Sequence, residues 1–231
     1  MNAMAQAEGK TLSGTESATD SKPQRGLFVV FEGIDGSGKS TIAKGVYDLL
    51  AKEIPGRVVL TAEPSDSWIG DCVRRANSED LGPATEALLF VADRAEHTKR
   101  IEKWLSEGKM VICDRYYAST LAYQGAQLKS IMGAQHAVAW LTLVNEPLII
   151  QPDLTLLLTL RVQTALERLR SRKERTKFED LDFLMDVDLI YRAVCMEDPS
   201  LITIDASRPV VEVIESALKA IRSKFYGRED G

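Results

Sequence analysis

Residues 27–40 read LFVVFEGIDGSGKS, and this stretch decides the fold class. The apolar residues 27–31 predict a strand, and residues 33–40 fit the pattern G-x-x-x-x-G-K-[ST] in full. Glycines in this pattern let consecutive backbone N–H groups curl around a phosphate without Cβ clashes, and the following helix adds positive potential at its N-terminus. A helix is predicted from about residue 40 to 52, so the motif has a strand before it and a helix after it. The sequence therefore predicts a phosphate-binding loop (P-loop).

Two residues of this motif and two farther along the chain carry the expected chemistry. Lys39 would reach the β- and γ-phosphates of a nucleotide as a point charge, and the Ser40 hydroxyl would ligate Mg²⁺. The apolar residues 110–113 predict a strand that ends at Asp114, at the sheet edge where open α/β folds bind ligands. Asp114 would therefore hold Mg²⁺ through water. Arg115 would lie in the same crevice and bind phosphate oxygens bidentately.

The rest of the chain alternates short apolar strands with longer helical stretches, which predicts a parallel sheet covered by helices. The fold class is α/β, a P-loop NTPase-type three-layer α/β/α arrangement with a five-stranded parallel sheet. Further strands are predicted at residues 58–61, 110–113, 154–158 and 201–204. Further helices are predicted at about 67–76, 83–108, 135–145, 162–170, 181–195 and 210–225. A helical stretch after Tyr116 is predicted to be interrupted near Gly125.

Composition narrows the class of protein. Residues 1–25 are polar and lack apolar periodicity, so we expect a disordered tail before one domain at 26–231. A net charge of −5 argues against general nucleic-acid or membrane-surface binding, and no apolar run approaches the roughly 20 residues of a membrane span. The three cysteines are widely spaced, which predicts free thiols in a reducing, cytoplasmic compartment and no zinc site.

Two further patterns are open to more than one interpretation. Phe90 and Arg94 are four apart on a predicted helix, so they could stack on a nucleobase and bind its edge, or belong to the helix core stripe. The cationic stretch at about 168–180 is either a lid that closes over a triphosphate or a solvated helix end. Its cations are Arg168, Arg170, Arg172, Lys173, Arg175 and Lys177. His97 and His136 are isolated in sequence and are expected to be core or surface residues.

Three segments in this order resemble thymidylate kinases: FEGIDGSGKST at 31–41, LLFVADR at 88–94 and DRYYASTLAYQG at 114–125. The resemblance runs from Gly26 to the C-terminus. It implies Mg²⁺-assisted, ATP-dependent phosphorylation of dTMP to dTDP in dTTP biosynthesis, without a covalent intermediate, by a homodimer. The P-loop has no arginine, which places the chain in the class with a lid arginine, here Arg172 or Arg175. Ala62 stands before Glu63 where many members carry arginine, which leaves that phosphate contact open.

The resemblance also implies roles by position. Phe90 would stack on thymine and Arg94 would bind its edge, while Tyr123 would lie under the sugar and disfavour a 2′-hydroxyl. Residues 205–209 would pass near the adenine of ATP. The implied ATP site is Gly33, Ile34, Asp35, Gly36, Ser37, Gly38, Lys39, Ser40 and Thr41. The implied dTMP site is Asp35, Arg74, Phe90, Arg94, Arg115, Ser119, Thr120, Tyr123 and Gln124. The implied catalytic groups are Lys39, Asp35, Arg115, Arg172 and Arg175.

Two other functions stay open at this point. The same loop would serve a deoxynucleoside kinase or another nucleotide kinase, although the segment at 119–124 favours dTMP. A GTPase-like switch or a nucleotide-binding partner protein would also use the P-loop. An N-K-x-D motif, which reads guanine, is not present in the sequence.

Overall fold

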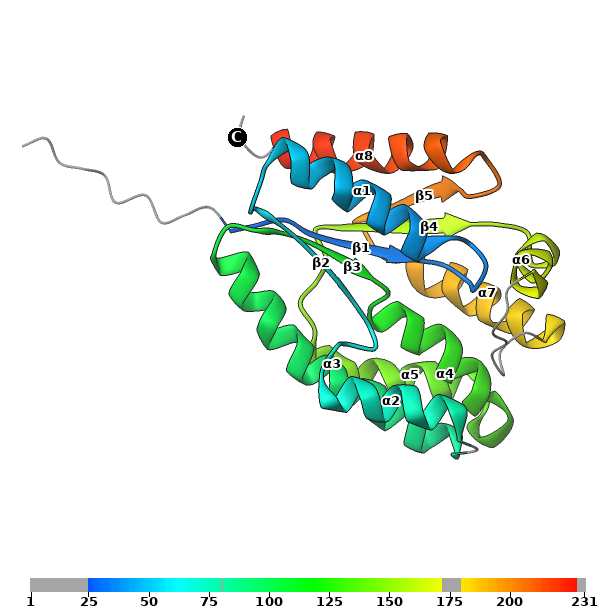
Figure 1. Ribbon diagram of the computed structural model, residues 1–231. Coiled ribbons are helices and arrows are strands. Elements are labelled where there is room, and N and C mark those ends of the chain that lie inside the picture. The colour runs from blue at the N-terminus through cyan, green and yellow to red at the C-terminus, as the bar shows by residue number, and fades with distance from the viewer. Residues whose placement is uncertain (1–24, 80, 172–179, 228–231) are drawn as a thin grey trace, which may run out of the picture.

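The computed structural model describes residues 25–79, 81–171 and 180–227 of the chain (Figure 1). Residues 1–24 of the tail predicted at 1–25, and the lid arginines Arg172 and Arg175, lie outside these residues. The sheet is parallel, in the order β2-β3-β1-β4-β5. Its strands are β1 (Phe28–Glu32), β2 (Val58–Ala62), β3 (Met110–Asp114), β4 (Leu154–Thr159) and β5 (Leu201–Asp205). The predicted α/β class and the five-stranded parallel sheet are confirmed.

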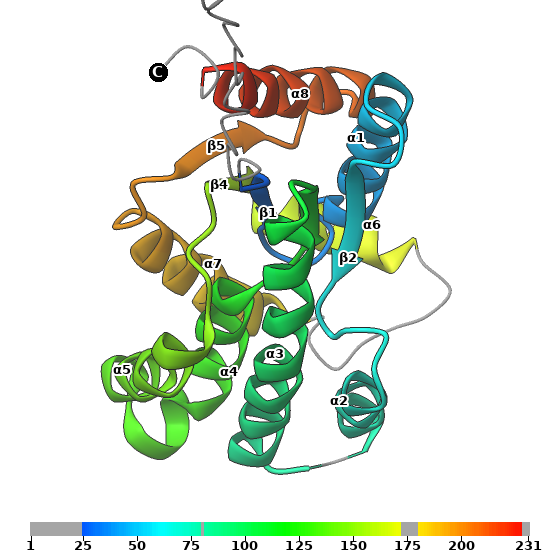
Figure 2. The ribbon, with the colours of Figure 1, turned by 90° about the vertical axis from the view of Figure 1, so that its left-hand side faces the viewer.

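Helices cover both faces of the sheet (Figures 1 and 2). They are α1 (Lys39–Glu53), α2 (Trp68–Ser78), α3 (Pro83–Ser106), α4 (Tyr117–Met132), α5 (Ala134–Asn145), α6 (Val162–Arg170), α7 (Leu181–Cys195) and α8 (Val210–Tyr226), with a 3₁₀ turn at Glu146–Leu148. Helices α1 and α8 pack on one face, and α3, α4 and α7 lie on the other. Helix α2 contacts α3, and α5 contacts α4, on the side away from the sheet. Among the described residues, no helix combines the length and apolar character that a membrane crossing requires.

The central strand β1 is buried on both faces, as its unbroken apolar run predicts. Val29 and Phe31 join the core beneath α1 and α8, whereas Phe28 and Val30 join the core beneath α3. This alternation follows from the two-residue period of a strand. Since β1 lies between β3 and β4, the loop after β1 emerges at the middle of the sheet edge.

The predicted interruption near Gly125 was wrong, because α4 is continuous from Tyr117 to Met132. A Cβ atom on Gly125 would lie 3.3 Å from Cγ2 of Val138 on α5. The glycine therefore serves close packing between α4 and α5 and does not end the helix. The chain turns at Gly133 instead, where φ is 81°.

Candidate active site

The loop between β1 and α1 wraps around the side chain of Lys39. Nζ of Lys39 donates to the carbonyl oxygens of Gly33 at 2.8 Å and Ile34 at 2.9 Å, and the side chain is buried. Gly33 has a φ of 138°, and a Cβ there would lie 2.5 Å from the carbonyl oxygen of Leu158. Glycine is therefore required at this position, because a side chain would collide with the backbone of β4.

Burial, with the nearby charge of Arg115, lowers the pKa of Lys39 to about 8. The carboxylates of Asp35 and Asp114 act in the opposite direction. Lys39 is thus a buried cation whose charge would be favoured by any anion entering the loop.

Asp35, Arg115 and Tyr123 join the loop to the start of α4. Arg115 forms an ion pair with Asp35, and its guanidinium lies 5.3 Å from the centre of the Tyr123 ring. The backbone N–H of Asp35 donates to the Tyr123 hydroxyl at 2.7 Å. Burial raises the pKa of Asp35, but the charges of Arg115 and Lys39 outweigh it and hold the pKa below its usual value. The P-loop and the start of α4 are therefore held together by one network of charged and hydrogen-bonded side chains.

Arg115 has a φ of 70°, which a non-glycine residue rarely adopts. Its backbone N–H donates a hydrogen bond to the carbonyl oxygen of Phe31 at 2.9 Å, and its own carbonyl oxygen accepts one from the Cys113 thiol at 3.0 Å. These contacts hold the backbone in a strained conformation, and strain of this kind clusters at functional sites.

A buried carboxylate that the sequence analysis missed connects these parts. Glu32 accepts hydrogen bonds from the backbone N–H of Tyr116 at 2.9 Å and of Ser119 at 3.2 Å. It also accepts from the hydroxyls of Ser119 at 2.6 Å and Tyr191 at 3.0 Å. Burial raises the pKa of Glu32 despite these hydrogen bonds. Glu32 therefore fixes the end of β1 to the start of α4 and to α7.

A cavity of about 160 Å³ opens beside this network. It brings together every residue predicted for the acceptor nucleotide except Arg74. Those residues are Asp35, Phe90, Arg94, Arg115, Ser119, Thr120, Tyr123 and Gln124. Glu63, Pro64, Asn77 and Tyr116 also line it and were not predicted.

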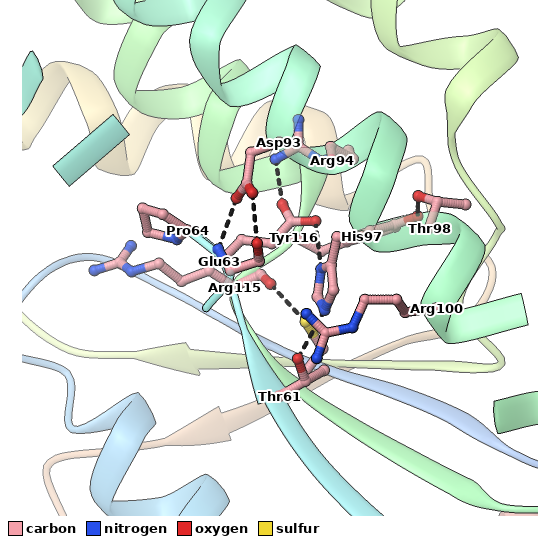
Figure 3. Close-up of polar contacts among 12 residues, drawn as sticks. Thr61, Glu63, Pro64, Asp93, Arg94, His97, Thr98, Arg100, Arg115 and Tyr116 are labelled. Carbon is pink, nitrogen blue, oxygen red and sulfur yellow. Dashed lines mark hydrogen bonds and ion pairs between the residues drawn. The ribbon is translucent and has the colours of Figure 1, made fainter. Parts of the chain in front are cut away.

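Arg94 is fully buried in the cavity wall and is held by three side chains. Its Nη1 donates to Oδ1 of Asn145 at 2.7 Å, and its Nη2 donates to Glu63 at 2.5 Å and to Thr120 at 3.0 Å. Its Nε has no hydrogen-bond partner within the described part of the chain. His97 contacts the other carboxyl oxygen of Glu63 at 3.1 Å (Figure 3). Arg94 is thus both a core residue and a preorganised donor beside the cavity, and His97 is a core residue.

A second cavity, of about 560 Å³, lies at the start of α1 and the ends of β2 and β3. Ser40 and Asp114 both line it, and Oδ1 of Asp114 is buried without a partner among the described residues. A hydroxyl and an unpaired carboxylate oxygen suit Mg²⁺, a hard cation that prefers oxygen ligands. These residues therefore fit the metal that the P-loop implies.

Comparison with known proteins gives the family. The family model described as thymidylate kinase matches residues 31–217. The chain belongs to the thymidylate kinase family. It is 41% identical over 201 residues to a protein of Methanospirillum hungatei named probable thymidylate kinase, covering 86% of this chain and 95% of the relative.

Other relatives agree with this match. A probable thymidylate kinase of Pyrococcus horikoshii is 45% identical over 168 residues, which cover 68% of this chain and 76% of the relative. The solved structure of thymidylate kinase from Candida albicans is similar with a TM-score of 0.72 and 27% identity. That likeness covers 86% of this chain and 92% of the solved one.

Within the thymidylate kinase family, the departure at Ala62 concerns the second cavity. Ala62 lines it, as do Arg74 and Arg100. Arg74 pairs with Asp71 at 2.7 Å and donates to the carbonyl of Pro64 at 3.2 Å. Arg100 pairs with Asp66. The cavity wall therefore carries cations from α2 and α3 near Ala62.

The predicted lid is described only at its two ends. Arg168 donates to the carbonyl oxygens of Gly36 at 3.4 Å and Ala206 at 3.0 Å. It therefore joins the P-loop to the segment at 205–209, which was expected near adenine.

Proposed function

We propose that this member of the thymidylate kinase family transfers the γ-phosphoryl group of ATP to the phosphate of dTMP, giving ADP and dTDP for dTTP biosynthesis. The observation that carries the proposal is the position of the smaller cavity beside the P-loop, with Asp35 and Arg115 reaching from one to the other. Because the site for ATP and the site for dTMP adjoin each other, the phosphoryl group can pass directly from one nucleotide to the other. An oxygen of the dTMP phosphate forms the new bond to γ-phosphorus, and the bond to the bridging oxygen of ADP breaks, so no covalent enzyme intermediate is needed.

Positioning and charge explain the proposed roles at the donor side. Residues 33–41 bind the ATP phosphates through backbone N–H groups, and Lys39 neutralises the β- and γ-phosphates. Ser40 and Asp114 would hold Mg²⁺, which neutralises phosphate charge when bound. Arg172 or Arg175 of the lid would contact the transferring phosphoryl group.

The acceptor side uses the smaller cavity. Phe90 stacks on thymine, Arg94 donates to its edge, and Ser119, Thr120 and Gln124 complete the base pocket. Tyr123 lies under the sugar and disfavours a 2′-hydroxyl. Arg115 binds the dTMP phosphate, Asp35 approaches the 3′-hydroxyl and the phosphate, and Arg74 approaches the phosphate from α2.

A homodimer and a cytoplasmic location complete the proposal. The homodimer rests on the family resemblance. The location is supported by the free thiols of Cys72, Cys113 and Cys195, which suit a reducing compartment.

The acceptor is tested by ADP release from Mg²⁺-ATP with dTMP, dUMP, thymidine, UMP, CMP, GMP and AMP. We expect a strong preference for dTMP. Turnover of thymidine but not of dTMP would contradict the proposed acceptor while keeping the ATP site.

Asp114→Asn is expected to raise the Mg²⁺ concentration that gives half-maximal turnover by about tenfold or more. The variant keeps the shape of the side chain but removes the charge beside the unpaired oxygen. The measurement is a Mg²⁺ titration of initial rate at saturating nucleotides. Asp66→Asn is the matched control, because Asp66 lines the same cavity but is exposed and paired with Arg100. Equal Mg²⁺ requirements in the two variants would contradict the assignment.

Nucleotide binding is expected to take up a proton near pH 8. Lys39 with a pKa of about 8 is half neutral there, and triphosphate favours its charged form, so uptake approaches about 0.5 proton per site. The contribution of Lys39, taken as the difference from Lys39→Arg, should vanish near pH 6, where Lys39 is already charged. Calorimetric titration with a non-hydrolysable ATP analogue in buffers of different ionisation enthalpy measures this number. The control is Lys39→Arg, whose cation does not titrate. Binding heats that are independent of the buffer at pH 8 would contradict the prediction.

A further inference from the structure

Three polar side chains form a line from the first turn of α3 to the smaller cavity. Glu86 is 1% exposed, and its Oε2 accepts a hydrogen bond from Nε2 of Gln127 at 2.9 Å. Oε1 of Gln127 in turn accepts from Nε2 of Gln124 at 3.2 Å. Gln124 and Gln127 are three residues apart on α4, so they share the face that meets α3. We call Glu86, Gln127 and Gln124 the amide relay.

The carboxylate at one end of the relay sets the direction of every hydrogen bond in it. A carboxylate accepts hydrogen bonds and donates none, so the NH₂ group of Gln127 must face Glu86. The carbonyl oxygen of Gln127 therefore faces Gln124, and the NH₂ group of Gln124 must point back toward it. A reversed amide at either position would place two acceptors or two donors against each other.

The consequence appears at the cavity end of the relay. Gln124 lines the cavity, and its NH₂ group is turned toward Gln127. In the described part of the chain, this donation to Gln127 is the one hydrogen bond of the Gln124 side chain, so its carboxamide oxygen is left to accept from a ligand. Arg94, which has only donors, lies in the same cavity wall. The wall thus offers one oriented acceptor and one obligatory donor.

We propose that Glu86 and Gln127 are positioning residues that fix Gln124 as a hydrogen-bond acceptor and thereby select an imide base. This inference rests on the proposed function, because it concerns the base of the acceptor nucleotide. Thymine and uracil carry an N3–H donor next to a carbonyl oxygen, which complements an acceptor beside a donor. Cytosine carries an acceptor at N3 and an amino donor at C4, so it meets Gln124 and Arg94 with the wrong polarity.

The selection follows from the cost of unpaired buried groups. A site built to hydrogen-bond a ligand rejects an analogue that leaves its polar groups without partners. If the relay lost its direction, Gln124 could rotate its NH₂ group toward the ligand and accommodate the N3 acceptor of cytosine. The amide relay therefore acts on discrimination between bases more than on binding of either base.

The test compares kcat/KM for dTMP and dCMP in the wild type, Glu86→Gln and Gln127→Met. Glu86→Gln replaces an obligatory acceptor by a group that also donates, and Gln127→Met removes the middle of the relay at similar volume. We expect the dTMP/dCMP ratio of kcat/KM to fall by about tenfold or more in both variants. Glu86→Asp keeps the carboxylate and should retain most of the ratio. Gln151→Met, on an exposed glutamine, is the control and should leave the ratio unchanged.

The ratio separates positioning from a purely structural role. Equal loss of activity with dTMP and dCMP, at an unchanged ratio, would overturn the proposal. Equilibrium binding of dTMP and dCMP to the same proteins, measured by calorimetry, gives the ratio of the dissociation constants, which measures discrimination without catalysis. A wild type that binds dTMP over dCMP but does not turn it over would contradict the proposed function and still test the relay. A wild type with no preference in binding would contradict the relay whatever the catalysis. Thermal melts identify a variant that does not fold. If either Glu86→Gln or Gln127→Met fails to fold, the dTMP/dCMP ratio of the other variant tests the proposal.

Discussion

Lys39→Ala is expected to lower kcat by about three orders of magnitude while the protein stays folded. The ammonium group is enclosed by the P-loop, where it donates hydrogen bonds to two backbone carbonyl oxygens and is buried. When a triphosphate occupies the loop, this charge stabilises the phosphate oxygens in the transition state, and a methyl group cannot replace it. Loss of the side chain also removes a cation that burial destabilises, so the effect on folding should be small.

The measurement is initial rate of ADP release with thermal melting of the same sample. Lys52→Ala is the matched control, since Lys52 lies on the same helix but is exposed in its last turn. The control should retain near-normal turnover. Near-normal turnover by folded Lys39→Ala protein would contradict the assignment of the P-loop as the ATP site.

Arg94→Met is expected to lower the free energy of unfolding by about 3–5 kcal/mol, since it leaves a buried carboxylate without its main partner. Glu63 is 2% exposed at its side chain and pairs with Arg94 at 2.5 Å. Glu63→Leu alone should be similarly destabilising, because it strands the guanidinium. Replacement of both residues should lower the free energy of unfolding by much less than the sum of the two single losses, since neither buried charge then remains without its partner.

Urea denaturation of the wild type, the two single variants and the double variant measures this coupling. Activity provides a separate readout. Both proteins that lack Arg94 should lose about 100-fold or more in kcat/KM for dTMP, including the double variant with recovered stability. Strictly additive stability changes would contradict the paired geometry, and normal dTMP turnover in the double variant would contradict the role of Arg94 in the pocket.

The parts of the fold and site that were predictable from sequence depend on short-range patterns. The P-loop residues are consecutive in sequence, and each strand is a short apolar run. These two patterns were enough to predict the parallel sheet and the α/β class. The segment at 114–125 likewise carries several cavity residues on one helix. In contrast, the interruption expected near Gly125 failed because glycine has two uses, and only the packing of Val138 against it distinguishes them.

The residues that sequence reasoning missed act over long separations. Glu63 and Asn145 hold Arg94 from positions 31 and 51 residues away, and Glu32 binds Ser119 from 87 residues away. No local pattern links such positions, because the parallel sheet brings them together only after folding. Glu32 did offer a signal, since an acidic residue at the end of a strand buried on both faces requires a compensating network. The ambiguity at Arg94 had a physical origin too, because the side chain is buried and also lines the cavity.

Direct phosphoryl transfer between two nucleotides is the central claim, and a single-turnover experiment with ATP labelled at the γ-phosphate tests it most directly. Excess enzyme is mixed with labelled ATP, Mg²⁺ and dTMP, and the reaction is quenched over time to separate nucleotides, inorganic phosphate and protein. The account predicts that the label passes to the β-phosphate of dTDP as ATP disappears, with none retained on the protein at any time. Label that accumulates on the protein, or appears as inorganic phosphate while dTMP stays unchanged, would contradict it.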